Sequence, residues 1–233
     1  MLLSTACNND LDCFSNKSDE KNLSFNTEDY INFHFSDVFE VQVFQDSAKK
    51  ITIEGPEYLV SKVDLKRNQS NMELSIKDPC NFLKDQKQML TVSLFVPEID
   101  TLKFNTLSYL SIPDTFTSAL LVLQFWGKTG SSNITVNTDR IFFYSACLAG
   151  NFDFKGKTRR FTAELRKAST FNTKNLNTRF GVVHQFSANN CYITASERLI
   201  ANIYNKGNVY IDSLPEITEI EYFGEGQVIV TKD

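Results

Sequence analysis

The 233-residue sequence has few of the residues that bind metal ions, and it lacks the long apolar run of a membrane span. It contains two histidines and five cysteines, and no two cysteines show a CxxC spacing. Structural zinc sites use four such ligands at short, regular spacings, so we expect no metal site. No stretch approaches the roughly 18 consecutive apolar residues of a transmembrane helix. We therefore expect neither a zinc protein nor a membrane-spanning segment beyond the extreme N-terminus.

Sequence motifs of the common enzyme classes are also missing. There is no Gly-x-Ser-x-Gly elbow, no phosphate-binding glycine loop and no acidic loop with calcium-binding spacing. Cleavage of polysaccharides needs two or three carboxylates that converge on one face. After residue 100 the acids are dense only between Glu216 and Glu225, where a polar end cap explains them. We expect no catalytic residues, no cofactor and no enzyme, with a polysaccharide-active enzyme as the least favoured alternative.

The charge of the chain is concentrated near its start. The formal net charge is -4, and residues 8–29 alone hold six acids and two bases. A polar, acidic terminal segment cannot bury enough surface to offset its ordering entropy. We therefore predict a flexible tether over 8–29, followed by a neutral domain. Its 20 phenylalanines and 8 tyrosines favour β-strands over helices.

The first residues, MLLSTAC, have the pattern of the end of a bacterial lipoprotein signal. An apolar stub and small residues precede Cys7, whose thiol is the group that a lipid would modify. Residues 1–7 are thus expected to be a signal remnant with lipidation at Cys7, and an ordinary terminal cysteine is the alternative. This predicts an outer-membrane lipoprotein, periplasmic or surface-exposed, whose partner is the membrane through its lipid anchor and not nucleic acid.

The remaining cysteines are expected to divide into two pairs with different roles. In an exported protein two of the four would be oxidised, and a disulfide between Cys13 and Cys80 would pin the tether to the domain. Cys147 and Cys191 fall in segments too far apart to bridge, so we expect both to be buried as small hydrophobic residues.

Residues 30–98 contain alternating strands separated by turns, without a clear repeat. The segments on either side of Asn68 to Asn71 predict a hairpin, and the strand around QMLTVSLFV is expected to continue it as an antiparallel meander. Pro56 is expected to start a short helical turn. We interpret this region as an antiparallel β cap on the remainder, 99–233.

Beyond residue 100 the sequence repeats with a step near 20 residues. Each repeat has an apolar pair, a polar turn and a second apolar pair, so two columns of residues advance together. The first column is Phe104, Phe125, Tyr144, Leu165, His184, Ile203 and Tyr222; the second is Ile112, Val136, Phe154, Thr173, Ile193, Ile211 and Val230. Such a step without helical periodicity predicts an all-β fold, a β-solenoid of about seven coils in which equivalent residues stack inward. A β-sandwich is the alternative.

The whole layout resembles a known family. A lipobox, an acidic spacer, CNF near the middle and the closing stretch GNVYIDSLPEITEIEYFGEGQVIV are similar to the family described as "putative auto-transporter adhesin, head GIN domain", found mainly in Bacteroidetes lipoproteins. The resemblance covers about residues 30–231, although the Ser-Gly-Ala-Gly-Asp turns typical of the family are replaced here. It implies a right-handed parallel β-helix at the cell envelope and brings no catalytic residues with it.

Three features of the repeat region are candidate sites. Trp126 should point outward and could stack on a sugar ring, or it could pack under a loop. His184 should lie in the inward column, as a hydrogen-bonded core residue or a functional group. The basic side chains between 155 and 179 could form a stripe that attracts an anionic ligand, or a solvated face. The six basic residues chosen for that patch are Lys155, Lys157, Arg159, Arg160, Arg166 and Lys167.

We therefore expect an envelope-anchored, non-enzymatic β-solenoid that acts in adhesion or carbohydrate binding, with a cell-surface or extracellular glycan as its partner. A structural or scaffold lipoprotein without a small ligand is the alternative. The sequence does not indicate an oligomeric state.

Overall fold

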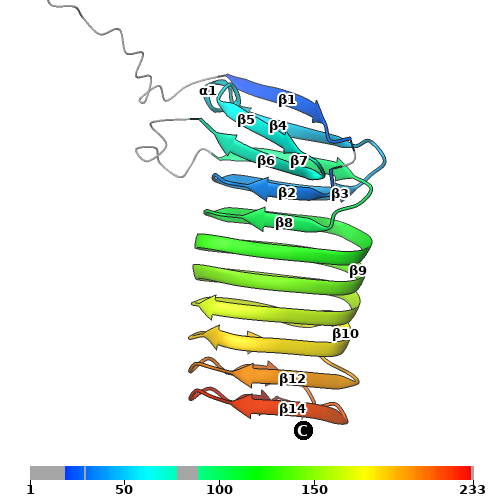
Figure 1. Cartoon of the computed structure of the whole chain (residues 1–233), viewed down its shortest axis with the longest axis vertical. Coiled ribbons are helices and arrows are strands. Elements are labelled where there is room, and N and C mark those ends of the chain that lie inside the picture. The colour runs from blue at the N-terminus through cyan, green and yellow to red at the C-terminus, as the bar shows by residue number, and fades with distance from the viewer. Residues whose placement is uncertain (1–18, 29, 78–88, 232–233) are drawn as a thin grey trace, which may run out of the picture.

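The computed structural model describes residues 19–28, 30–77 and 89–231, and it is built almost entirely of β-strands (Figure 1). The predicted all-β class is confirmed. The only helix is α1 (Glu57–Val60) among these residues, which confirms the helical turn expected after Pro56. The strands are β1 (Glu20–Asn26), β2 (Asn32–Phe35), β3 (Phe39–Gln45), β4 (Lys50–Pro56), β5 (Val63–Asn68), β6 (Asn71–Ile76), β7 (Leu90–Val96), β8 (Thr101–Phe104), β9 (Ser108–Lys167), β10 (Ser169–Ser187), β11 (Cys191–Tyr192), β12 (Arg198–Ile203), β13 (Val209–Ile211), β14 (Ile217–Tyr222) and β15 (Val228–Val230).

All of these strands belong to one curled, 15-stranded sheet. Strands lie across the long axis of the molecule, with β1 at one end and β14 and β15 at the other (Figure 1). β9 runs for 60 residues without a break, and it curls so far that it pairs with β3, with β8 and with β10.

Pairing in the second half is parallel, with a step that matches the predicted repeat. Phe180 of β10 pairs with Arg160 of the preceding turn of the chain and with Arg198 of the following turn. β12 then pairs with β14, and β13 with β15, again in parallel. Parallel neighbours need a return path for the chain, and here the curl of the strand itself provides it.

The second column of the repeat is confirmed where pairs of strands can be compared. Asn172 pairs with Asp153 and with Tyr192, and Tyr192 pairs with Tyr210. These residues each precede a member of the column, and Ile211 and Val230 pair directly. Six column members are buried: Ile112, Val136, Phe154, Thr173, Ile193 and Ile211.

The first column is wrong by one residue in two places. Phe104 pairs with Phe125, and Ile203 with Tyr222, as predicted. Leu165, however, pairs with Gln185 and not with His184. Because side chains alternate across a strand, an error of one position moves a residue to the other face. His184 and Tyr144 therefore lie on the outer face, half-buried.

The N-terminal region corrects two expectations. The predicted hairpin is confirmed, since β5 and β6 are antiparallel with Asn68 opposite Asn71. The cap is nevertheless mixed, because β2 and β3 pair in parallel with the strands on both of their sides. The expected meander does not form: β7 pairs with β4 and β3, whereas β6 pairs with β5 and β2.

The second correction concerns the predicted tether 8–29, which is partly folded. Residues 20–26 form β1, antiparallel to β4. Leu23 and Phe25, two residues apart in this otherwise polar segment, lie partly buried against the core. Alternating burial of side chains is typical of a strand with one face on the core, and the backbone pairing with β4 holds this strand at the edge of the sheet. The prediction of a tether rested on the charge of the segment and overlooked these two apolar residues.

A single hydrophobic core runs from the first strands to the last, which explains the abundance of phenylalanine. Phe35, Phe104 and Phe125 stack along the long axis, with ring centroids 5.0 Å and 4.7 Å apart. Phe143 continues the series in edge contact with Phe125, at 6.2 Å. The described residues of 30–98 and of 99–231 therefore share one core.

Candidate functional site

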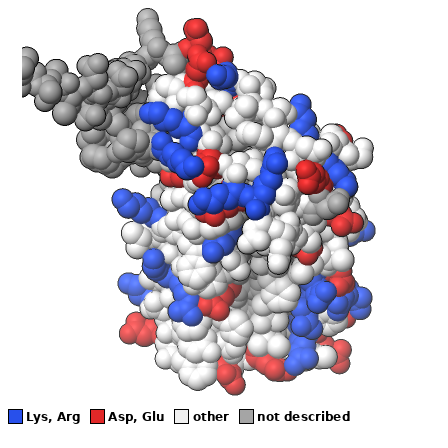
Figure 2. Space-filling model, turned by 45° about the horizontal axis from the view of Figure 1, so that its top comes forward, with Lys and Arg blue, Asp and Glu red and all other residues white. Residues whose placement is uncertain are grey.

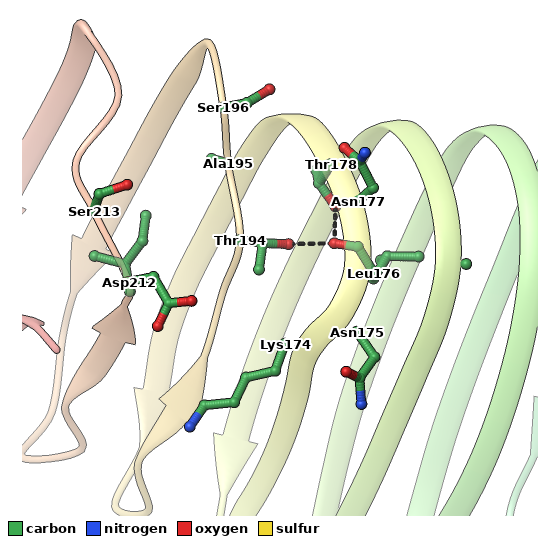
Figure 3. Close-up of a pocket in the computed structure, with 12 residues that line it drawn as sticks. Lys174, Asn175, Leu176, Asn177, Thr178, Thr194, Ala195, Ser196, Asp212 and Ser213 are labelled. Carbon is green, nitrogen blue, oxygen red and sulfur yellow. Dashed lines mark hydrogen bonds between the residues drawn. The ribbon is translucent and has the colours of Figure 1, made fainter. Parts of the chain in front are cut away.

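A hollow lined largely by polar residues lies at a corner of the curled sheet. We call it the corner groove; it has a volume of about 390 Å³ and is lined by Gly156, residues 174–178, residues 194–196 and residues 211–213 (Figure 3). Its lining comes from equivalent positions of successive turns of the chain. The groove therefore crosses several strands and runs along the molecule. This shape suits a ligand that is itself an extended chain.

The groove begins at an irregularity in β10. The register between β10 and β9 shifts between Asn172 and Asn175, so that two residues, Thr173 and Lys174, are accommodated opposite Phe154. A bulge of this type redirects the side chains beside it. Thr173 is buried, whereas Lys174 is exposed and lies along the groove (Figure 3).

Gly156 permits the tight corner on the neighbouring turn. Its φ is +103°, and a Cβ atom placed there would lie 2.0 Å from the carbonyl oxygen of Val136. Residues with side chains rarely adopt this backbone conformation. The corner therefore depends on glycine at this position.

Several polar side chains in the groove make no hydrogen bond to any residue that the structure describes. They are two amides, Asn175 and Asn177, and two hydroxyls, Ser196 and Ser213. Thr194, by contrast, is held by the fold, since its hydroxyl donates to the carbonyl oxygen of Leu176 at 2.6 Å (Figure 3). The free amides and hydroxyls can exchange hydrogen bonds with the hydroxyl groups of a ligand.

Two charged side chains face the groove. The ammonium group of Lys174 lies 4.3 Å from the centre of the Tyr192 ring, a cation–π contact. On the other wall the carboxylate of Asp212 accepts hydrogen bonds from the hydroxyl of Tyr192 and, at 3.0 Å, from that of Thr231. Tyr192 thus contacts both the cation and the anion.

A second hollow, of about 460 Å³, lies over β2, β6 and β8. It contains His34 and Glu73, whose Nδ1 and Oε1 atoms are 4.0 Å apart, and Glu73 also accepts a hydrogen bond from Ser36 at 2.8 Å. The carboxylate is thus occupied by two neighbours. Over the described residues no three His, Cys, Asp or Glu side chains gather closely enough to hold a metal ion.

The six basic residues chosen from the sequence do not form one stripe. Arg160 and Arg166 lie on the same strand with five residues between them, about 20 Å apart at 3.3 Å per residue. Lys155 and Lys157 lie at the corner before them, and Lys167 lies at the far end. On the face visible in Figure 2, basic and acidic side chains are interspersed.

Two of the arginines form ion pairs with acids of the same sheet. Arg159 reaches Asp139 on the preceding turn with contacts of 2.5 Å and 3.1 Å, and Arg166 contacts Glu164 at 2.6 Å. The hydrogen bond from Arg159 lowers the pKa of the Asp139 carboxyl. Arg179 and Glu197 form a similar pair, and the hydrogen bond from Arg179 lowers the pKa of Glu197.

Trp126 points outward, as predicted, and is 41% exposed. Its ring lies 4.4 Å from that of Tyr144 at a tilt of 32°, so one of its two faces is partly covered. A second row of outward aromatics stacks ring on ring: Phe186, Tyr204 and Phe223 are nearly parallel, with centroids 4.1 Å and 4.8 Å apart. Rings packed face to face offer mainly their edges to a sugar.

His184 is a surface residue and not a member of the inward column. It pairs with Glu164 and Asn202 on the neighbouring strands, and its Nδ1 atom lies 3.1 Å from the amide nitrogen of Asn202. The inward position is taken by Gln185, whose amide donates to the carbonyl oxygen of Asn189 at 2.7 Å. The buried polar group expected here is thus a glutamine.

The cysteines fall into two sets. Cys7, Cys13 and Cys80, with the expected lipidation and disulfide, lie outside the described residues. Cys147 and Cys191 are free and buried, as predicted. Burial raises the pKa of both thiols, so they stay protonated and unreactive.

Sequence reasoning missed the corner groove. Its signal was present in the polar run NTKNLNT, where Leu176 is the one apolar residue and points into the core. The bulge that turns Lys174 outward has no signature in a single sequence. The groove forms only where equivalent positions of several turns lie side by side, and this arrangement is not apparent from one repeat of the sequence.

Comparison with known proteins gives one family match and several similar folds. The family model described as "Putative auto-transporter adhesin, head GIN domain" matches residues 29–215. No curated protein gives a significant match. Within the described residues no helix is long and apolar enough to cross a membrane.

Three solved structures resemble nearly the whole chain. A "putative adhesin" from Bacteroides fragilis has a TM-score of 0.81 at 15% identity, over 91% of this chain and 97% of that one. A "putative adhesin" from Parabacteroides distasonis has a TM-score of 0.66 at 15% identity, over 91% and 96%. A "putative lipid binding protein" from the same organism has a TM-score of 0.62 at 13% identity, over 92% and 98%. At these identities the similarity is one of fold.

Proposed function

The chain belongs to the family described as "putative auto-transporter adhesin, head GIN domain", and on that premise we propose that it is a non-enzymatic adhesion module that binds carbohydrate at the cell envelope. The observation that carries the proposal is the corner groove. It offers free amide and hydroxyl groups, a carboxylate and an ammonium group along several turns of the chain (Figure 3).

The chemistry of this lining suits a sugar chain. Carbohydrate hydroxyls act as both donors and acceptors, and amide side chains such as Asn175 and Asn177 can meet both needs. Asp212 can accept from a sugar hydroxyl in addition to its internal donors, because a carboxylate has about four acceptor sites. The apolar face of a sugar ring could lie on an aromatic ring, and Trp126 is the exposed aromatic proposed for a second contact.

The proposal includes the finer architecture and the place of the molecule in the cell. The parallel pairing of successive turns, at a step that matches the sequence repeat, supports a right-handed β-solenoid of about seven coils. Lipidation of Cys7 and a disulfide between Cys13 and Cys80 would hold this domain at the outer membrane. Mass spectrometry of the protein from a lipoprotein-processing host tests both modifications, and an unmodified Cys7 would remove the anchor from the proposal.

The test of function is binding of the purified domain to an array of neutral and acidic glycans. We expect binding that is lost when Asn175 and Asn177 are both changed to alanine. Asn151→Ala, an exposed amide of β9 outside the groove, serves as the matched control and should bind normally. Absence of binding to every glycan would favour the alternative, a scaffold lipoprotein without a small ligand.

A further inference from the structure

Three lysines border the corner groove, and each lacks an anionic partner within the described part of the chain. Lys155 and Lys157 pair in register with Asn175 and Asn177, the two free amides of the groove. All four are exposed, and paired residues of parallel neighbours project to the same side of the sheet. Neighbouring strands are about 4.8 Å apart, so the two lysines, on either side of the groove residue Gly156, lie one strand away from the two amides. Lys174 lies inside the groove itself (Figure 3).

The arginines of the same region behave differently. Arg159, Arg179 and Arg198 each contact an acid on a neighbouring turn, and Arg166 contacts Glu164 on its own strand. The guanidinium group forms bidentate contacts with carboxylates, so it suits a permanent ion pair between turns. Arg160 forms no ion pair with a described acid; its guanidinium group lies 6.0 Å from the centre of the Phe180 ring, away from the groove lining. The unpaired cations beside the groove are thus lysines.

Two acids stand among these lysines, and both have partners. Asp153 accepts a hydrogen bond from Asn172 at 3.0 Å, and Asp212 accepts from Tyr192 and Thr231. The three lysines outnumber the two acids, so the net charge of these five residues is positive. Both carboxylates already accept hydrogen bonds from neutral groups of the fold.

Resting on the proposed function, we infer that the ligand of the corner groove is an acidic glycan, whose anionic groups bind Lys155, Lys157 and Lys174. A neutral sugar would leave three ammonium groups without a counter-charge. A small anion alone would leave the amides and hydroxyls unused. An acidic sugar chain satisfies both sets, with its anionic groups at the lysines and its hydroxyls at Asn175, Asn177 and Asp212.

The experiment measures binding of the purified domain to three soluble polysaccharides: polygalacturonate, which carries carboxylates; dextran sulfate, which carries sulfates; and neutral dextran. We expect binding to an acidic chain that weakens as salt is raised, because exposed charges are screened. The double variant Lys155→Gln, Lys157→Gln should bind roughly tenfold more weakly, and Lys174→Gln about threefold more weakly.

The matched control is the double variant Lys128→Gln, Lys206→Gln, which removes two exposed lysines away from the groove. It changes the net charge equally and should bind like the parent. Equal losses in both double variants would show a non-specific charge effect and overturn the inference. The tighter of the two acidic polymers identifies the anion as carboxylate or sulfate.

Failure of the inference can be told apart from failure of the proposed function. Binding to neutral dextran or to neutral array glycans that needs Asn175 and Asn177 but not the lysines would keep carbohydrate binding and overturn the acidic ligand. Binding to no glycan, acidic or neutral, would overturn both. Circular dichroism and thermal melting of each variant exclude loss of fold as the cause.

Discussion

Gly156 shows how one residue determines the geometry of the groove. Its positive φ and its contact with the backbone of Val136 leave no room for a side chain. We predict that Gly156→Ala lowers the free energy of unfolding by more than about 1 kcal/mol, because alanine is strained at this φ and its Cβ meets backbone that cannot move aside. Urea unfolding measures the loss.

The matched control is Gly130→Ala. A Cβ there would lie 3.1 Å from the nearest heavy atom, at the tip of the Phe152 side chain, and the φ of Gly130 is not positive. A side chain can shift where a carbonyl cannot, so the control should be destabilised less. Equal loss in the two variants would contradict the importance of the corner.

At the scale of the elements, ion pairs between neighbouring turns give the fold a dependence on pH. Arg159 lowers the pKa of Asp139, and Arg179 lowers that of Glu197. A carboxyl whose pKa is lower in the folded state stabilises the fold above its unfolded pKa, about 4, and this stabilisation is lost as the pH falls through the folded pKa. We predict that the double variant Asp139→Asn, Glu197→Gln loses less stability than the parent between about pH 5 and pH 2.

Urea midpoints across that pH range test the prediction. Glu225→Gln is the control, because Glu225 is an exposed acid without an ion-pair partner in the described residues. It should retain the pH dependence of the parent. A double variant with the parent's slope would mean that the two pairs contribute nothing, which is common for exposed pairs in salt.

The elements also show what the sequence could and could not predict. The second column was predictable because its members from Phe154 to Ile211 are buried, even at Thr173, beside the shift of register in β10. The first column failed at Tyr144 and His184, because the residues that follow them, Ser145 and Gln185, are polar and yet buried. Period-2 patterns cannot separate the two faces when both carry apolar residues, as the outward Phe186 and Tyr204 do here.

The groove and the ion pairs could not be predicted from the sequence for a related reason. Arg159 and Asp139 lie one repeat apart in the chain, and Lys155 is separated from Asn175 by the same step. The repeat predicted that step. To predict which cations form ion pairs and which stay unpaired, however, the register must be known to within one residue. β1 was missed because two apolar residues among charges give too short a pattern.

Across the whole molecule, the two ends of the sheet differ. At one end β1 and α1 cover the first strands, whereas at the other β14 and β15 each pair with one strand only in the described structure. Ile217, Tyr222 and Val230 of these strands are exposed. We predict that amide hydrogens of β14 and β15 exchange fastest among the strands of the second half, since few buried contacts hold them.

Hydrogen exchange followed by mass spectrometry measures this gradient along the chain. Peptides from β10, which is paired on both sides, are the internal reference and should exchange slowest. Uniform exchange along the second half would show that the molecule opens as one unit.

The orientation of the strands has a mechanical consequence. Because the strands lie across the long axis, the backbone hydrogen bonds that join them point along it (Figure 1). A load applied between the first strand and the corner groove therefore passes through successive strand interfaces in series. The tensile limit of the molecule is then that of its weakest interface between the two points, and adding more turns lengthens its reach without making it stronger.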